Sequence, residues 1–292
     1  MDILSEITDH KRIEVELQKQ AVSPEQLREQ VRDLMENSPA PRRSMKRALA
    51  SSPAGIIAEF KRRSPSKGWI YETAKADEIP AAYEAAGASA ISILTDEKFF
   101  GGSLRDIRTA RPLVDIPILR KDFIINEYQL LQARIAGADA VLLIAACLTQ
   151  EECADLTARA HALGLEVLLE IHSPRELAYI SKDVDMVGVN NRNLGTFVTD
   201  VENSFRIAGQ LRQTIADVRN IPDAQDSSDN PRNLPLLVSE SGISHPETIC
   251  RLRTAGFRGF LIGETFMKTP QPGDALKGFI QGIEETEAQK SL

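Results

Sequence analysis

The stretch Ile56-Ile57-Ala58-Glu59-Phe60-Lys61 carries an acid and an amine inside an otherwise apolar run. Its length and branched side chains predict a buried β-strand. Side chains two residues apart in a strand lie on the same face, so Glu59 and Lys61 are expected to share one poorly solvated site. A loop of Ser, Pro and Gly residues follows at 64–68. This arrangement favours proton transfer on an anionic substrate over simple packing.

Similar apolar runs recur along the rest of the chain, separated by segments of helical composition. They lie at residues 90–94, 116–119, 140–145, 167–171, 186–189, 236–238 and 260–262. Three of them follow a glycine, Gly87, Gly137 or Gly256, which is typical of the turn from a helix into a strand. Buried strands that alternate with helices in this way predict a closed (β/α)8 TIM barrel. A doubly wound open sheet is the rival interpretation, and the lack of a GxGxxG or GxxxxGK[ST] motif after the first run disfavours it.

The remaining segments define the expected domain organisation. Residues 1–50 have helical spacing and composition, and we expect a helical extension that covers the catalytic end of the barrel. Residues 51–285 form a single catalytic barrel in this interpretation. The acidic, proline-containing segment 215–233 is predicted to be an inserted surface loop whose charges are solvated rather than metal-binding.

Composition limits the class of ligand. The chain has 292 residues, a net charge of -7 and a pI near 5.3, which argues against a general binder of nucleic acids or anionic membranes. Its three cysteines show no CxxC pairing, and the N-terminus lacks a signal pattern. We therefore expect a cytoplasmic protein that acts on a small molecule.

Charged and amide side chains follow the predicted strands, where barrels place their reacting groups. Parity along the runs predicts that six of them share one inward face: Glu59, Lys61, Lys121, Glu170, Asn190 and Glu240. Salt bridges that lock the barrel rim are the alternative, but burying several ions costs several kcal/mol per ion unless they are paired. The four histidines lack metal-ligand spacing, so no metal site is predicted. We expect His172 to begin the helix after the fifth strand rather than to face the site.

Two late loops have the composition of phosphate sites. Ser241-Gly242-Ile243 follows the seventh strand and Gly263-Glu264-Thr265 follows the eighth. Small residues expose backbone N–H groups at the positions where barrels bind phosphate, and Ser64 from the first loop can add a hydroxyl. Tight turns without a ligand are the alternative.

Five longer motifs resemble the indole-3-glycerol phosphate synthase family of tryptophan biosynthesis. They are AEFKRRSPSKG at 58–68, LTDEKFFGGSL at 94–104, LRKDFI at 119–124, GVNNRNL at 188–194 and VSESGI at 238–243. The resemblance implies a carboxy-lyase without a cofactor. It would close the pyrrole ring of 1-(2-carboxyphenylamino)-1-deoxyribulose 5-phosphate, with loss of CO2 and water. We expect it to act as a monomer.

The resemblance also implies roles for individual residues. Lys121 resembles the general acid and Glu170 its acid/base partner in the dehydration, while Lys61, held by Glu59, resembles the lysine that contacts the substrate carboxylate and shares the acid role. Asn190 and Glu240 resemble groups that orient the substrate and the lysines. The phosphate positions are matched by Ser64, Ser241, Gly242, Gly263 and Glu264. The ring pocket is matched by Phe100, Phe123, Leu194 and Leu261, with Arg192 as a cation beside the ligand.

Elementary chemistry agrees with such a reaction. A lysine that is partly desolvated and lies beside other cations has a lowered pKa, so we expect a proton donor that works near neutral pH. The competing enzyme interpretation is another phosphate-binding barrel, phosphoribosylanthranilate isomerase. A Cys or Asp acid/base pair at the first and fifth strands would favour it, whereas this chain has Glu59, Lys61 and Glu170 there. A catalytically inactive barrel that serves as a scaffold subunit is the alternative from another class, and the polar residues at the strand ends argue against it.

Overall fold

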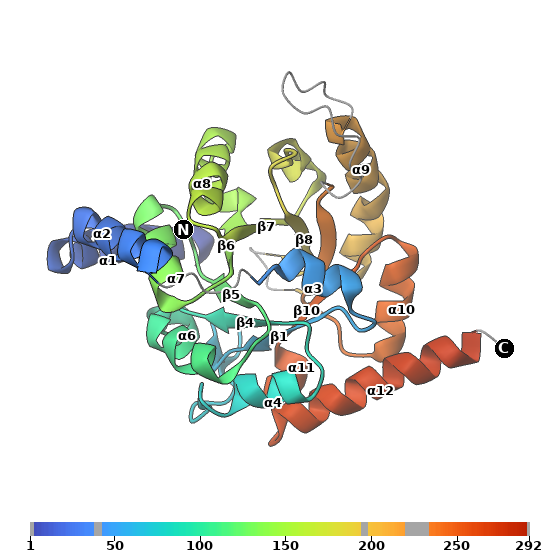
Figure 1. Cartoon of the computed structure of the whole chain (residues 1–292). Helices are drawn as coiled ribbons and strands as arrows, with labels where there is room; N and C mark the ends of the chain where they lie inside the picture. Colours follow the sequence, from blue (N-terminus) through green and yellow to red (C-terminus); the bar gives the residue numbers. More distant parts are fainter. Residues whose placement is uncertain (1–2, 38–42, 194–197, 220–233, 291–292) are drawn as a thin grey trace.

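The chain folds into a closed parallel barrel, described here from a computed structural model that covers residues 3–37, 43–193, 198–219 and 234–290. Within these residues, eight parallel strands form the barrel, and β1 closes it by pairing with both β4 and β10 (Figure 1). The strands are β1 (Ile56–Phe60), β4 (Ala90–Leu94), β5 (Ile118–Lys121), β6 (Ala140–Ile144), β7 (Glu166–Ile171), β8 (Met186–Asn190), β9 (Leu236–Glu240) and β10 (Gly259–Ile262). The prediction of a (β/α)8 barrel is thus confirmed.

Helices alternate with these strands around the outside of the barrel (Figure 1). They are α4 (Ile79–Ala85), α5 (Glu97–Phe100), α6 (Leu104–Ala110), α7 (Glu127–Ala136), α8 (Gln150–Ala162), α9 (Glu202–Arg219), α10 (Pro246–Thr254), α11 (Glu264–Met267) and α12 (Pro272–Lys290). Short 3-10 helices are η1 (Arg111–Leu113), η2 (Ala145–Cys147) and η3 (Pro174–Tyr179). Gly87, Gly137 and Gly256 have φ of 98°, 95° and 103°, as the predicted turns into the strands require.

One predicted boundary is wrong. The surface loop expected at 215–233 does not begin at residue 215, because α9 continues through residues 215–219. Ile207, Leu211 and Ile215 are each four residues apart, so they share one helix face, and all three are buried in the core. Residues 220–233 lie outside the described part of the chain.

Alternate residues of each strand pack in two different cores. In β1, Ile56 belongs to the outer core between the barrel and its helices, whereas Ile57 belongs to the core inside the barrel. Leu119 and Leu168 also point into the barrel. This alternation follows from the two-residue period of a strand, and it explains why the runs are apolar on both faces.

Helix α3 (Met45–Ser51) closes the end of the barrel opposite the predicted site. Met45 and Leu49 are 0% and 1% exposed, and both pack into the inner core. Glu166 at the start of β7 holds the helix, because its carboxylate accepts hydrogen bonds from the Ser44 hydroxyl (2.5 Å) and the Lys46 N–H (2.9 Å). Figure 1 shows α3 crossing the barrel opening. The sequence did not lead us to expect this plug.

The two first helices, α1 (Ile3–Ala21) and α2 (Pro24–Asn37), lie beside α7 (Figure 1). Their apolar faces pack on Tyr128 and Leu131, and the Tyr128 hydroxyl lies within donating distance of two carbonyl oxygens, those of Gln18 (3.0 Å) and Val22 (2.9 Å). The start of α1 thereby reaches the carboxyl ends of the strands. No helix in the described ranges is both long and apolar enough to cross a membrane.

The plug generates a test of stability. Replacing the buried side chain in Leu49→Ala should lower the free energy of unfolding by about 2–5 kcal/mol, because it leaves a cavity in the inner core. Leu113→Ala removes the same atoms from a residue that is 49% exposed, and we expect it to cost less than about 1 kcal/mol. Urea unfolding of both variants gives the comparison, and equal losses would contradict the plug.

Candidate active site

A cavity of about 630 Å³ opens at the carboxyl ends of the strands. Every predicted site residue within the described part of the chain lines it, and Leu194 lies outside that part. The strand-end residues in the cavity are Glu59, Lys61, Lys121, Glu170, Asn190 and Glu240. The register places Asn190 opposite Glu240 and Glu170 opposite Gly188, two residues before Asn190, so all four positions have the same parity and face the same side of the sheet. The parity argument therefore identified the inward face correctly.

Glu59 and Lys61 form the contact that their spacing predicted. Lys61 Nζ lies 2.5 Å from Glu59 Oε1, and both side chains are largely buried. Burial raises the pKa of the Glu59 carboxyl, but Lys61 and Lys121 outweigh this effect and hold the pKa below its ordinary value. Glu59 is therefore ionised and fixes the Lys61 ammonium at the mouth of β1.

Lys121 at the end of β5 contacts Glu170, with 3.3 Å between Nζ and Oε2. Burial lowers the pKa of the Lys121 ammonium, but the neighbouring glutamates, Glu170 foremost, outweigh this effect and raise the pKa above its ordinary value. The expectation of a lowered lysine pKa is therefore wrong for this site. It assumed that other cations dominate the surroundings, whereas carboxylates do.

Glu170 and Glu240 form a pair of carboxyl groups with opposite behaviour. Both are buried. Burial raises the pKa of Glu170, yet Lys121 and His172 bring it well below its ordinary value, and Asn190 adds a hydrogen bond. Burial and the charge of Glu170 raise the pKa of Glu240 well above its ordinary value. Adjacent buried carboxyls do not both ionise readily, so Glu170 carries the charge and Glu240 holds the proton.

Two glycines leave room for the carboxylates of neighbouring strands. A Cβ atom at Gly188 would lie 2.0 Å from Glu240 Oε1, and one at Gly263 would lie 2.3 Å from Glu59 Oε1. Neither distance is compatible with a side chain, since both are far inside van der Waals contact. The glycines therefore set where the two glutamates can lie.

His172 does not line the cavity, in line with the expectation that it would not face the site, but it contacts Glu170, and the sequence analysis missed this role. It precedes η3 instead of beginning a helix, and its Nε2 lies 3.3 Å from Glu170 Oε1, behind that carboxylate. Burial lowers the pKa of His172, but Glu170 and Glu176 outweigh it and raise the pKa to about 9. The two-residue spacing from Glu170 was the signal available, since it puts both side chains on one face.

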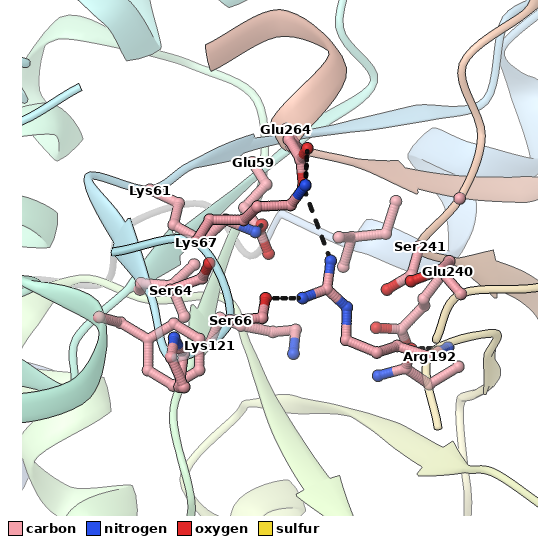
Figure 2. Close-up of a pocket in the computed structure, with 18 of the residues that line it drawn as sticks. Glu59, Lys61, Ser64, Ser66, Lys67, Lys121, Arg192, Glu240, Ser241 and Glu264 are labelled. Carbon is pink, nitrogen blue, oxygen red and sulfur yellow. Dashed lines mark hydrogen bonds and ion pairs between the residues drawn. The ribbon is translucent and has the colours of Figure 1, made fainter. Parts of the chain in front are cut away.

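Hydroxyl and cationic groups gather at the loops after β1, β8, β9 and β10 (Figure 2). Arg192 donates from Nη1 to Ser66 Oγ (2.7 Å), and Glu264 lies between 3.7 and 3.8 Å from the Arg192 and Lys67 nitrogens. The buried Ser64 hydroxyl has no hydrogen-bond partner among the described residues. Ser66 and Lys67 were not predicted, although both stand in the loop that begins with Ser64.

The loop after β9 has an unusual backbone conformation. Ser241 has a φ of 69° and Gly242 a φ of 78°, so two successive residues adopt the left-handed conformation. This is unusual for serine and marks a strained turn at the cavity. Glu264 fits the predicted phosphate group less well, because its carboxylate would repel an anion and pairs with the nearby cations instead.

An apolar wall completes the cavity. The rings of Phe100 and Phe123 lie 6.0 Å apart between centroids and are tilted by 37°. Leu261 adds to this wall from β10, and helix α1 contributes its first apolar turns through Ile3, Leu4 and Ile7. The sequence indicated a covering helix but not which of its side chains reach the cavity. Among the described residues, no cluster of three or more His, Cys, Asp or Glu side chains could hold a metal.

The raised pKa of His172 makes stability depend on pH. A histidine whose pKa rises on folding stabilises the protein below its unfolded pKa, here 6.5, and the stabilisation is lost as the pH rises through about 9. Relative to His172→Gln, the wild type should lose on the order of 3 kcal/mol of unfolding free energy across this interval. Urea unfolding from pH 6 to pH 10 measures the difference.

Glu176→Gln is the matched control for this titration. It removes one of the two carboxylates that raise the pKa of His172, so the loss of stability should begin at a lower pH. A difference between wild type and His172→Gln that stays constant with pH would contradict the assigned charge of His172.

Comparison with known proteins places the chain among its relatives. The sequence matches the family described as indole-3-glycerol phosphate synthase over residues 4–279. The protein of that name from Bacteroides thetaiotaomicron is 67% identical over 283 residues, which cover 97% of this chain and 99% of the relative. The one from Magnetococcus marinus is 40% identical over 284 residues, covering 94% and 97%. A match of this extent, on a barrel whose strand ends carry the motifs described above, means that the chain belongs to the indole-3-glycerol phosphate synthase family.

Proposed function

We propose that the cavity converts 1-(2-carboxyphenylamino)-1-deoxyribulose 5-phosphate into indole-3-glycerol phosphate, as a carboxy-lyase of tryptophan biosynthesis. The observation that carries the proposal is the buried ion pair of Lys121 and Glu170 inside a cavity that also has an apolar wall and cationic loops. These three parts correspond to the reacting ketone, the aryl ring and the phosphate of the substrate. Family membership supports the same assignment.

Lys121 is the general acid in this mechanism. The ring carbon that bears the carboxylate attacks the ketone carbon, and the carbonyl oxygen takes a proton from the Lys121 ammonium. The raised pKa keeps Lys121 protonated at neutral pH, and an alkoxide that forms within hydrogen-bond reach is basic enough to accept the proton. The carboxyl group then leaves as CO2, and its bonding electrons return to the ring.

Glu170 serves the dehydration that follows. It is ionised and contacts Lys121, so it is placed to accept the proton that the adjacent methylene carbon loses. The C–H electrons form the ring double bond, and the hydroxyl takes a proton from Lys61, which shares the acid role, and departs as water. Asn190 and Glu240 hold the Glu170 carboxylate through their contacts with it. We therefore assign them as orienting groups.

Binding of the substrate uses the remaining residues. Lys61, fixed by Glu59, grips the substrate carboxylate and can share the acid role of Lys121. The phosphate is assigned to Ser64, Ser241, Gly242 and Gly263, with Lys67 and Arg192 supplying positive charge nearby. Phe100, Phe123 and Leu261 hold the aryl ring. All of these residues come from one chain, so the proposal requires no second copy, nucleic acid or membrane.

Lys121→Ala tests the mechanism directly. Loss of the general acid should lower the turnover number by about 10²–10⁴-fold, measured by the fluorescence of the indole product formed from the carboxyphenylamino substrate. Lys75→Ala, a change in an exposed lysine paired with Glu78 at 2.7 Å, should leave turnover unchanged. Absence of product with the wild type, or full activity in Lys121→Ala, would overturn the proposal.

Gly188→Ala tests the placement of Glu240. The added methyl group would collide with the Glu240 carboxylate, and displacement of an orienting group by about 1 Å can cost about 100-fold in rate. Gly209→Ala is the matched control, because a Cβ atom there meets nothing within 4 Å. In the interior of α9 that change should stabilise the fold by about 1 kcal/mol and leave turnover intact. Equal turnover in the two variants would show that Glu240 does not need its present position.

A further inference from the structure

Helix α1 carries a lysine that is entirely buried. The Lys11 side chain is 0% exposed, and its Nζ lies 2.9 Å from Asp96 Oδ2, 3.1 Å from Asp122 Oδ1 and 2.8 Å from Glu14 Oε2. Lysine is almost never fully buried unless it is paired. Here the partners come from two barrel loops as well as from α1 itself, so the ammonium joins the extension to the barrel.

The position of Lys11 on the helix links it to the cavity. Ile3, Ile7 and Lys11 are four residues apart in turn, so they lie along one face of α1. Ile3 and Ile7 line the cavity. The contacts that hold α1 at Lys11 therefore also position the apolar side chains of Ile3 and Ile7 that cover the substrate site.

The two aspartates lie where the aromatic wall begins. Asp96 caps α5 by accepting the Phe99 N–H (2.7 Å), and α5 ends at Phe100. Asp122 accepts the Phe123 N–H (2.8 Å) and directly follows Lys121. One ammonium group thus touches the carboxylates that anchor both segments of the wall.

The charges in this cluster depend on one another. Asp122 also accepts from Thr95 (2.6 Å) and Arg120 (2.8 Å). The Oδ2 atom of Asp96, in contrast, is buried and has no hydrogen-bond partner among the described residues, so Lys11 is its compensating charge. Burial lowers the pKa of Lys11, but Asp122, Asp96 and Glu14 raise it above its ordinary value, so the ammonium stays charged.

We propose that Lys11 is a positioning residue that latches α1 over the cavity and sets the Phe100 and Phe123 wall around the aryl ring. The proposal rests on the proposed function for the identity of the substrate. Withdrawing the ammonium leaves the buried Asp96 carboxylate without a counter-charge and deprives Asp122 of one of its two cations, so α1 detaches and the substrate loses its apolar cover. The polar groups at the strand ends keep their places.

Lys11→Met tests the latch, with Lys19→Met as the matched control on the same helix. Lys19 pairs with Glu16 at the surface. We expect Lys11→Met to reduce kcat/KM by about 100-fold, mostly through a higher KM, and to speed hydrogen exchange of the α1 amides at least tenfold. Lys19→Met should change neither quantity. Wild-type KM and wild-type exchange in Lys11→Met would overturn the proposal.

A second variant separates positioning from mere stability. Asp96→Asn added to Lys11→Met removes the unpaired carboxylate and keeps the oxygen that caps α5, so the urea midpoint should recover while the high KM and fast α1 exchange persist. Recovery of KM together with the midpoint would assign Lys11 a structural role only and overturn the proposal. Hydrogen exchange of the α1 amides is measured independently of enzyme turnover. If neither wild type nor Lys19→Met formed product, the proposed function would fail while the latch was still measured.

Discussion

Mutual neutralisation of buried charges is the constraint on which this structure depends. The alternating side chains of β5 and the residue after it make the point: Lys121 faces the cavity, while Arg120 and Asp122 lie in the cluster that also contains Lys11. Each ion is buried, and each would be costly alone. Because one strand supplies both clusters, a shift in its register would separate acids from bases on both sides at once. The charges therefore specify the register of β5 as strongly as its apolar residues do.

The cavity combines two environments that the reaction needs in different steps. Under the proposed function, its cationic loops attract and hold the anionic substrate, whereas the wall of Phe100 and Phe123 and the apolar side chains of α1 exclude water from the aryl ring. Loss of CO2 moves the electrons of a localised carboxylate charge into the ring, and a poorly solvated pocket favours this dispersal of charge. Gly188 and Gly263 leave space for the carboxyl groups of Glu240 and Glu59, so these polar groups can lie in the same cavity as the apolar wall.

Sequence patterns predicted the features that are local. The apolar runs located every barrel strand to within a few residues, and parity placed Glu59, Lys121 and Glu170 on one face, because a strand repeats every two residues. What depended on distant parts of the chain was missed or wrong. Lys11 stands in a helix with several charged residues, where it resembles any solvated lysine, and only its contacts with Asp96 and Asp122 from distant parts of the chain distinguish it. The predicted direction of the Lys121 pKa shift was wrong. It depends on the carboxyl groups that other strands bring near Lys121, and these cannot be identified from the sequence of one strand.

The plug formed by α3 also constrains the order in which the chain can fold. Met45 and Leu49 belong to the inner core, to which all eight barrel strands contribute, and Leu49 lies beside Gly259 of β10. The helix is synthesised before every strand that surrounds it, yet its binding surface is complete only when the last strand joins β1. Synthesis proceeds from the N-terminus, so these apolar side chains lack part of their final packing until β10 has been made. The early helix α3 can therefore pack fully only after β10 has been synthesised, and the barrel is closed at this end only when both elements are in place.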